Sequence, residues 1–159
     1  MTLVLIRVDD RLVHGQVLLG WTRSLRVDHV IAADDATAKD IMQTTLMKMA
    51  APTGLGLSVL SVAESARKLL AGDFDKAKVL LLVRGPQSLL ELREAVLTFD
   101  KVNAGNVRSA PGRKKLTKEI FAGPEDITAW KQLAAEGVSL EAQWLPDQSR
   151  RNLADLLDD

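Results

Sequence analysis

The chain has 159 residues, with 21 basic and 21 acidic side chains and no cysteine. The zero net charge offers no argument for a nucleic-acid partner, and the missing thiols exclude disulfides, thiolate zinc sites and a cysteine nucleophile. The length favours one domain over residues 1–159, and no apolar run reaches the roughly 18 residues that a membrane helix needs, so we expect a cytoplasmic protein.

The first half of the chain alternates short apolar runs with segments whose apolar residues recur at helical spacing. In chain order, the pattern predicts a strand over 3–8, a helix over 15–26, a strand over 30–33, a helix over 37–49 and a strand over 57–60. Either Asp34 or Asp35 is expected to cap the second helix. Ser61 and Glu64 form a capping-box pattern that opens a third helix, which ends near Gly72.

The second half continues the alternation. Its elements are predicted as a strand over 79–83, a helix over 86–97, a strand over 99–103, a strand over 115–121, a helix over 124–136, a loosely alternating run over 138–145 and a helix over 147–157. Strands that alternate with helices in this way indicate βαβ units and an α/β fold with a mostly parallel sheet covered on both faces. Because no helix precedes 115–121, we expect an antiparallel or edge strand there.

The segment from Arg7 to Val17 is the richest in reactive side chains. It contains His14, one of two histidines in the chain, after two aspartates and two arginines. Ligands of open α/β sheets bind beyond the carboxyl ends of the strands, where this segment lies. At the start of a helix, free N–H groups and the helix dipole favour an anion and help to keep a histidine neutral and nucleophilic.

The neighbours of His14 suit phosphoryl transfer through the imidazole. We expect Arg7 and Arg11 to bind phosphate oxygens, because arginine makes bidentate contacts to phosphate. Asp10 is expected to orient the imidazole by holding one ring nitrogen protonated. Gly15 allows the backbone to approach a ligand closely, and Gln16 supplies a backbone or amide contact.

Other polar residues are predicted at the same edge of the sheet. They follow later strands, and we expect them to shape a partner or substrate loop: Asp34, Asp35, Arg84, Asn103, Gly105 and Arg108.

Two other interpretations of His14 remain open from the residues alone. It shares a helical face with Leu18, Trp21 and Leu25, which also fits a structural histidine at the edge of the core. A metal site of Asp9, Asp10 and His14 is disfavoured, because no second histidine lies at ligand spacing and the arginines would repel a cation. We therefore expect no metal and no cofactor.

The sequence R-V-D-D-R-L-V-H-G-Q-V over 7–17 resembles the signature of the IIB component of the mannose/fructose/sorbose class of the bacterial phosphotransferase system. Shorter segments resemble the same family in the right order: V-I-A-A-D-D over 30–35, M-A-A-P over 49–52, N-A-G-N over 103–106, P-E-D-I over 124–127 and G-V-S-L-E over 137–141. Many relatives have two glycines where this chain has Gly105-Asn106, and the basic segment over 107–115 also departs from the commonest version.

The resemblance implies a three-layer α/β/α fold and a sugar phosphotransferase. It implies that His14 accepts phosphate at Nδ1 from a phosphohistidine on a IIA component, with Nε2 left for a supporting contact. His14 then passes the phosphate to a sugar presented by the membrane components IIC and IID, to which the chain is peripheral. The IIA partner is expected as a separate chain, and a homo-oligomer is left open.

Two alternatives to transport use the same site. A regulatory phosphohistidine protein would be phosphorylated at His14 and would control a partner. A phosphate-ligand binding module would bind a phosphosugar without turnover.

Overall fold

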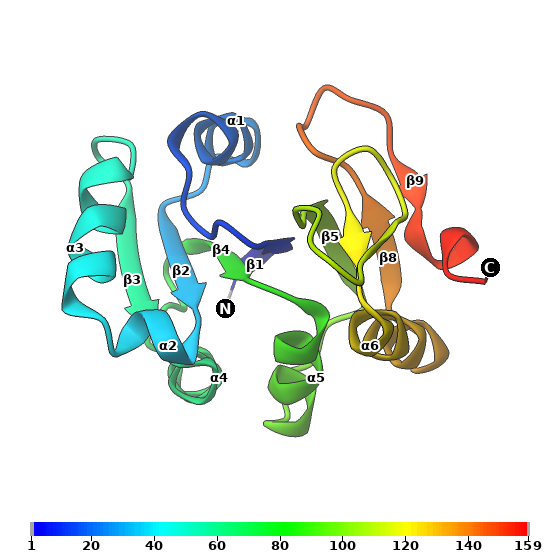
Figure 1. The fold of residues 1–159 in the computed structure, drawn as a ribbon. Coiled ribbons are helices and arrows are strands. Elements are labelled where there is room, and N and C mark those ends of the chain that lie inside the picture. The colour runs from blue at the N-terminus through cyan, green and yellow to red at the C-terminus, as the bar shows by residue number, and fades with distance from the viewer. Residues whose placement is uncertain (1, 159) are drawn as a thin grey trace.

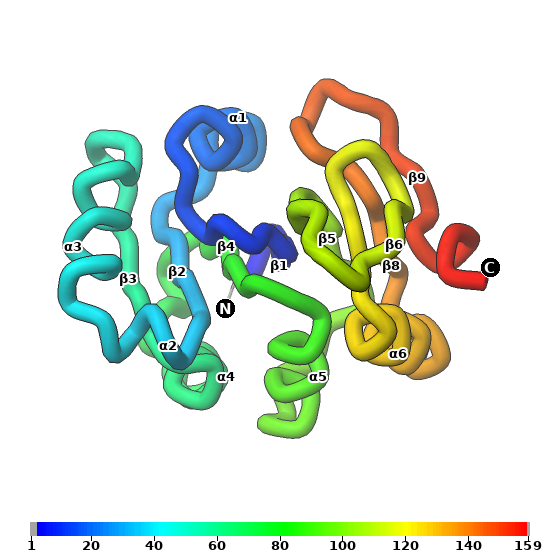
Figure 2. Tube along the Cα trace, viewed as in Figure 1, coloured from blue at the N-terminus to red at the C-terminus, as the bar shows by residue number. Residues whose placement is uncertain are grey.

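The computed structural model describes residues 2–158. Its elements in chain order are β1 (Thr2–Asp9), α1 (Gly15–Leu25), β2 (His29–Ala33), α2 (Asp35–Ala38), α3 (Ile41–Ala50), β3 (Gly56–Leu60), α4 (Val62–Ala71), β4 (Lys78–Val83), α5 (Pro86–Glu94), β5 (Lys101–Asn106), β6 (Lys114–Lys115), β7 (Phe121–Ala122), α6 (Pro124–Ala135), β8 (Ser139–Ala142), β9 (Arg151–Asn152) and a 3₁₀ helix, η1 (Leu153–Leu156). Figures 1 and 2 show their arrangement.

Seven strands form the central sheet, in the order β3-β2-β4-β1-β5-β8-β9. Neighbouring strands from β3 to β8 run parallel, and β9 pairs antiparallel with β8. Strand β1 therefore lies between β4 and β5, in the interior of the sheet. The strand crossovers carry helices, as βαβ units require.

Helices cover both faces of the sheet (Figure 1). On one face, α4, α5 and α6 pack against the sheet through a core that includes Leu69, Leu92 and Trp130. On the other face, α1 contributes Leu18 and Trp21 to a second, smaller core. The predicted α/β fold with a three-layer α/β/α arrangement and a mostly parallel sheet is confirmed.

The predicted helix over 37–49 is wrong in one respect, because two helices occupy the segment. The Asp34 carboxylate accepts from the N–H of Thr37 and caps α2, while the Asp40 carboxylate accepts from the N–H of Gln43 and caps α3. A second capping aspartate inside the segment starts a new helix in a new direction.

The 115–121 region forms no continuous strand. The Thr117 hydroxyl accepts from the N–H groups of Glu119 and Ile120, and this local turn divides the segment. Strands β6 and β7 on its two sides pair antiparallel outside the central sheet. The antiparallel character is as predicted.

The predicted C-terminal helix over 147–157 is also absent. Strand β9 instead pairs with β8, and the Asn152 side chain then caps the four-residue η1. Strand β5 begins at Lys101 and continues to Asn106, so Asn103 and Gly105 lie within the strand and not after it. Among residues 2–158, no helix is long and apolar enough to cross a bilayer.

Candidate functional site

The loop between β1 and α1 holds its shape through a turn at the end of β1. The N–H of Leu12 donates to the carbonyl of Asp9 at 2.9 Å. Leu12 has a φ of 55°, in the left-handed region that bulky side chains avoid. Its side chain is buried in the core beneath α1, which offsets the backbone strain and anchors the loop.

His14 occupies the N-cap position of α1 with extended backbone, and its side chain does not cap the helix. Its Nε2 lies 3.2 Å from Oδ2 of Asp9, and its side chain is 25% exposed. Nδ1 makes no hydrogen bond within residues 2–158. One nitrogen of the ring is thus held by Asp9, and the other has no partner among these residues.

Asp9 is the carboxylate that meets the imidazole. It is 1% exposed, and its two oxygens also accept from Arg7 Nη2 at 3.3 Å and from the N–H of Arg11 at 3.0 Å. Burial alone would raise the pKa of Asp9, but the hydrogen bond to His14 and the charge of Arg7 outweigh it and hold the pKa below its usual value. Asp9 is thus an anion behind the ring.

Acid is expected to remove the stabilisation that Asp9 provides. Because the folded pKa of Asp9 lies below the unfolded value of about 3.9, its contribution is present above that value and is lost as the pH falls through the folded pKa. Urea denaturation from about pH 6 to about pH 3 measures the free energy of unfolding. As the pH falls, the free energy of unfolding should decline less steeply in Asp9→Asn than in the unchanged chain. The same dependence on pH in both proteins would contradict a stabilising role for the Asp9 carboxylate.

Arg7 is a buried support for Asp9 and is wrongly predicted as a phosphate ligand. It is 1% exposed, and Nη1 donates to Asn103 Oδ1 at 2.6 Å and to the Gln143 carbonyl at 3.1 Å. Its Cζ also lies 5.5 Å from the ring centroid of Trp21. With these partners satisfied inside the protein, the guanidinium cannot reach a phosphate at the surface.

Asp10, predicted to orient the imidazole, faces the other way. Side chains alternate along an extended chain, so Asp9 shares a side with Arg7 while Asp10 points away. The carboxylate of Asp10 accepts from Asn106 Nδ2 at 3.2 Å, and from the N–H and Nε of Arg108 at 2.9 and 3.2 Å. Asp10 and Arg108 thus join the β1–α1 loop to the chain after β5.

The first turn of α1 completes the site. Leu18 N–H donates to the His14 carbonyl, and the earlier N–H groups of the helix have no partner within it. Gln16 and Arg11 are exposed. A side chain at Gly15 would meet only the Ala50 carbonyl oxygen, at 3.5 Å, so this glycine is not required by packing.

The sequence matches the family model described as "PTS system sorbose subfamily IIB component" over residues 3–159. The chain belongs to this family. It is 32% identical to the "PTS system fructose-specific EIIB component" of Bacillus subtilis over 157 residues, covering 99% of this chain and 96% of that one. The family resemblance read from the sequence is confirmed, and with it a place among the phosphocarriers of sugar uptake.

Two further relatives bear on partners and fold. The IIB chain is 31% identical to the Escherichia coli "PTS system mannose-specific EIIAB component", covering 99% of this chain and 49% of that protein. It thus spans about half the length of that relative. The solved IIB domain of the sorbose permease from Klebsiella pneumoniae superimposes with a TM-score of 0.93 at 29% identity, covering 99% of this chain and 96% of that chain.

The remaining predicted loop residues of the IIB chain divide into two groups. Arg84 Nε donates to Asp34 Oδ2 at 3.1 Å, and its Nη atoms donate to the Asp10 carbonyl and the Thr37 hydroxyl, so Arg84 ties the His14 loop to α2. Asp35, in contrast, accepts from the N–H of Val62 and serves the start of α4. Within residues 2–158, no cluster of His, Cys, Asp or Glu has the form of a metal site.

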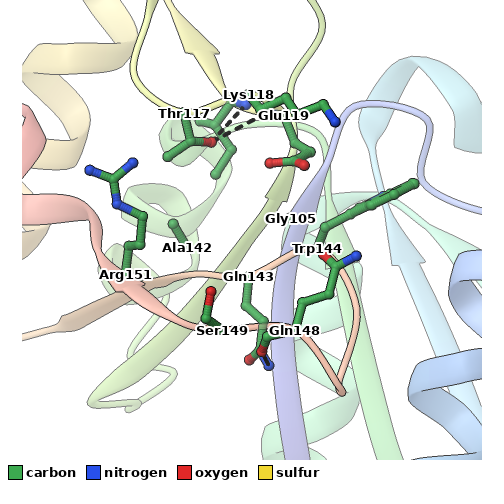
Figure 3. Close-up of a pocket in the computed structure, with 11 residues that line it drawn as sticks. Gly105, Thr117, Lys118, Glu119, Ala142, Gln143, Trp144, Gln148, Ser149 and Arg151 are labelled. Atoms are coloured by element: carbon green, nitrogen blue, oxygen red, sulfur yellow. Dashed lines mark hydrogen bonds between the residues drawn. The ribbon is translucent and has the colours of Figure 1, made fainter.

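Gly105 separates Arg7 from a pocket of about 370 Å³ (Figure 3). A Cβ at Gly105 would lie 2.0 Å from Arg7 Cζ, so only glycine leaves room for the guanidinium. The pocket lies between the turn at Thr117 and the loop after β8, and its lining includes Gln143 and Trp144. It does not include His14.

Sequence reasoning missed the roles of Asp9 and Gln143. The sequence suggests Asp9 only as a metal ligand, although Asp9 follows Arg7 by two residues on one strand, which places both side chains on the same side. Gln143 contributes a backbone carbonyl to Arg7 and Asn103, and no side-chain pattern signals such a role.

Proposed function

We propose that His14 is the phosphocarrier residue of this IIB chain. It accepts a phosphoryl group at Nδ1 from a phosphohistidine of a IIA component and transfers it to a sugar at the membrane components IIC and IID. The observation that carries the proposal is the Nε2–Asp9 contact of 3.2 Å at the start of α1, which leaves Nδ1 without a partner in residues 2–158.

The Asp9 contact favours the reactive form of the ring. A carboxylate accepts from Nε2–H, so the neutral imidazole carries its proton there and keeps its lone pair at Nδ1. In the first transfer, Nδ1 bonds to phosphorus as the N–P bond to the donor histidine breaks, and the donor ring, already protonated at its other nitrogen, leaves as a neutral imidazole. The positive charge that develops on the His14 ring is balanced by Asp9.

The phosphate oxygens require donors at the protein surface. The free N–H groups at the start of α1 are suited to them, and the exposed guanidinium of Arg11 lies three residues before His14 in the sequence. In the second transfer, a sugar hydroxyl bonds to phosphorus while the N–P bond to His14 breaks. The departing imidazole is basic enough to take up the proton that the hydroxyl loses.

The names of similar proteins suggest the substrate class. Relatives are named for fructose, mannose, sorbose and N-acetylgalactosamine. These are hexoses or a hexose derivative, so we assign a hexose-type sugar to this chain. The IIB chain would act in the cytoplasm and bind the membrane through its IIC and IID partners.

Phosphate mapping tests the proposal. Incubation with phosphoenolpyruvate, the general phosphotransferase proteins and the IIA protein of the same organism should give an acid-labile phosphate on His14, linked at Nδ1 by NMR. Addition of membranes with IIC and IID and a hexose should discharge it. The other histidine, His29, bonds the Ser58 hydroxyl at 2.8 Å and serves as internal control. Phosphate on His29, or none on either ring, would refute the role of His14.

A further inference from the structure

Helix α3 presents an apolar surface that nothing in residues 2–158 covers. The helix has no buried side chain. Six large hydrophobic side chains are exposed in the described part of the chain, and four of them belong to α3: Ile41, Met42, Leu46 and Met49, at 85%, 73%, 57% and 76%. Exposed apolar side chains that cluster in this way mark an interaction surface.

Three of these residues form one stripe. Met42, Leu46 and Met49 are spaced i, i+4 and i+7, which places them on one face of the helix. Met47 packs instead against the core beneath α1, so the α3 stripe (Met42, Leu46 and Met49) points away from the protein. Methionine is flexible and polarisable, which suits a surface that binds and releases a partner.

The charge of α3 favours a protein partner over a membrane surface. Lys48 is the single charged residue between Ile41 and Ala50. Amphipathic helices that bind lipid carry several lysines or arginines for anionic headgroups, and α3 lacks them.

The end of α3 lies next to the candidate site. Ala50, the last residue of α3, places its carbonyl oxygen 3.5 Å from the position of a Cβ at Gly15, and Gly15 follows His14. Figure 1 shows α3 beside the sheet, with its end turned toward the start of α1. Met49, one residue earlier, is the member of the stripe nearest in sequence to this contact.

A protein bound over His14 is wide enough to cover α3 as well. A standard interface buries about 800 Å² on each partner, which corresponds to a disc of roughly 16 Å radius. Helix α3 has ten residues, and at 1.5 Å per residue it is about 15 Å long. A partner centred on His14 thus reaches the α3 stripe.

We propose that the α3 stripe docks the IIA component that phosphorylates His14. This inference rests on the proposed function, because a donor histidine can reach Nδ1 only if its protein covers the start of α1. A second copy of the chain on this face would cover His14 and block transfer, which argues against a homodimer here. A relative is named as a mannose-specific EIIAB component, which supports a IIA protein as the partner.

A double variant, Leu46→Glu with Met49→Glu, tests docking. Both side chains are exposed, so the change leaves the core intact. With the phosphorylated IIA protein of the same organism as donor, phosphorylation of His14 at limiting IIA should slow at least about tenfold. With phosphoramidate, a small donor that needs no docking surface, the rate should be unchanged.

Leu70→Glu is the matched control, since Leu70 is an exposed apolar residue at 53% on α4, which packs on the opposite face of the sheet. It should leave both rates unchanged. A rate of transfer from IIA that is unchanged in the double variant would overturn the proposal, as would an equal loss of rate with phosphoramidate. A loss confined to transfer from His14 to the sugar would also overturn it. So would sedimentation data in which the unchanged chain alone is a dimer and the double variant is a monomer. Failure of both donors to label the unchanged chain would refute instead the role of His14.

Discussion

Replacing Asp9 by Asn is expected to slow phosphate transfer through His14 on the order of 10²- to 10⁴-fold, the range seen when a carboxylate behind a functional histidine is removed. The amide still fits, but it carries no charge to balance the phosphorylated ring and can present its NH₂ group to Nε2. Arg7, which is 1% exposed, also loses its buried counter-charge. Single-turnover labelling of His14 from phosphorylated IIA measures the effect.

Asp10→Asn is the matched control for this prediction. Asp10 is the adjacent carboxylate, but its partners are Asn106 and Arg108 and not the imidazole. Its replacement should change the labelling rate by less than about tenfold, since Asp10 does not contact the imidazole and its partner Arg108 is 58% exposed to solvent. A larger effect at Asp10 than at Asp9 would show that the wrong carboxylate has been placed behind the ring.

Gly105→Ala is expected to lower the free energy of unfolding by about 3 kcal/mol or more and to impair phosphate transfer. The new Cβ would lie 2.0 Å from Arg7 Cζ and 2.3 Å from Nη1. Overpacking of a core costs about 1–3 kcal/mol, and displacement of the buried guanidinium breaks its bond to Asp9 in addition. Urea denaturation of the two chains gives the difference directly.

Gly20→Ala makes the same chemical change without the clash. At Gly20, within α1, a Cβ would meet Leu145 Cδ2 at 3.7 Å, which is ordinary contact. Alanine in a helix interior is favoured over glycine by about 0.5–1 kcal/mol, so this variant should be slightly more stable than the unchanged chain. Equal free energies of unfolding for Gly105→Ala and Gly20→Ala would contradict the predicted clash, because Arg7 would then have to move aside at no cost.

Local patterns were sufficient for the parts of the fold that depend on neighbours in sequence. The apolar run of β4 becomes a fully buried central strand, and the Ser61 hydroxyl accepts from the N–H of Glu64 as a capping pattern predicts. His14 lies at the strand-to-helix junction where the sequence places it. The break at Asp40 was missed because the helical spacing of apolar residues continues across it.

The support of the site depends on contacts that are remote in sequence. Arg7 reaches the Gln143 carbonyl across 136 positions and the Asn103 side chain across 96. Such contacts follow from strand order, which places β5 beside β1, and not from any local motif. The choice between Asp9 and Asp10 depended on the same packing, because only the side that holds Arg7 stabilises a buried carboxylate.

Strand β1 in the interior of the sheet and helix α3 at the surface differ in the free energy needed to open them. Backbone groups of an interior strand exchange with solvent only when the whole domain opens, so the Arg7–Asp9 pair persists as long as the protein is folded. Helix α3, which has no buried side chain, can open locally at a small fraction of that free energy. Helix α3 can therefore adapt to a partner, or accumulate substitutions, while the Arg7–Asp9 pair that supports the His14 imidazole stays unchanged.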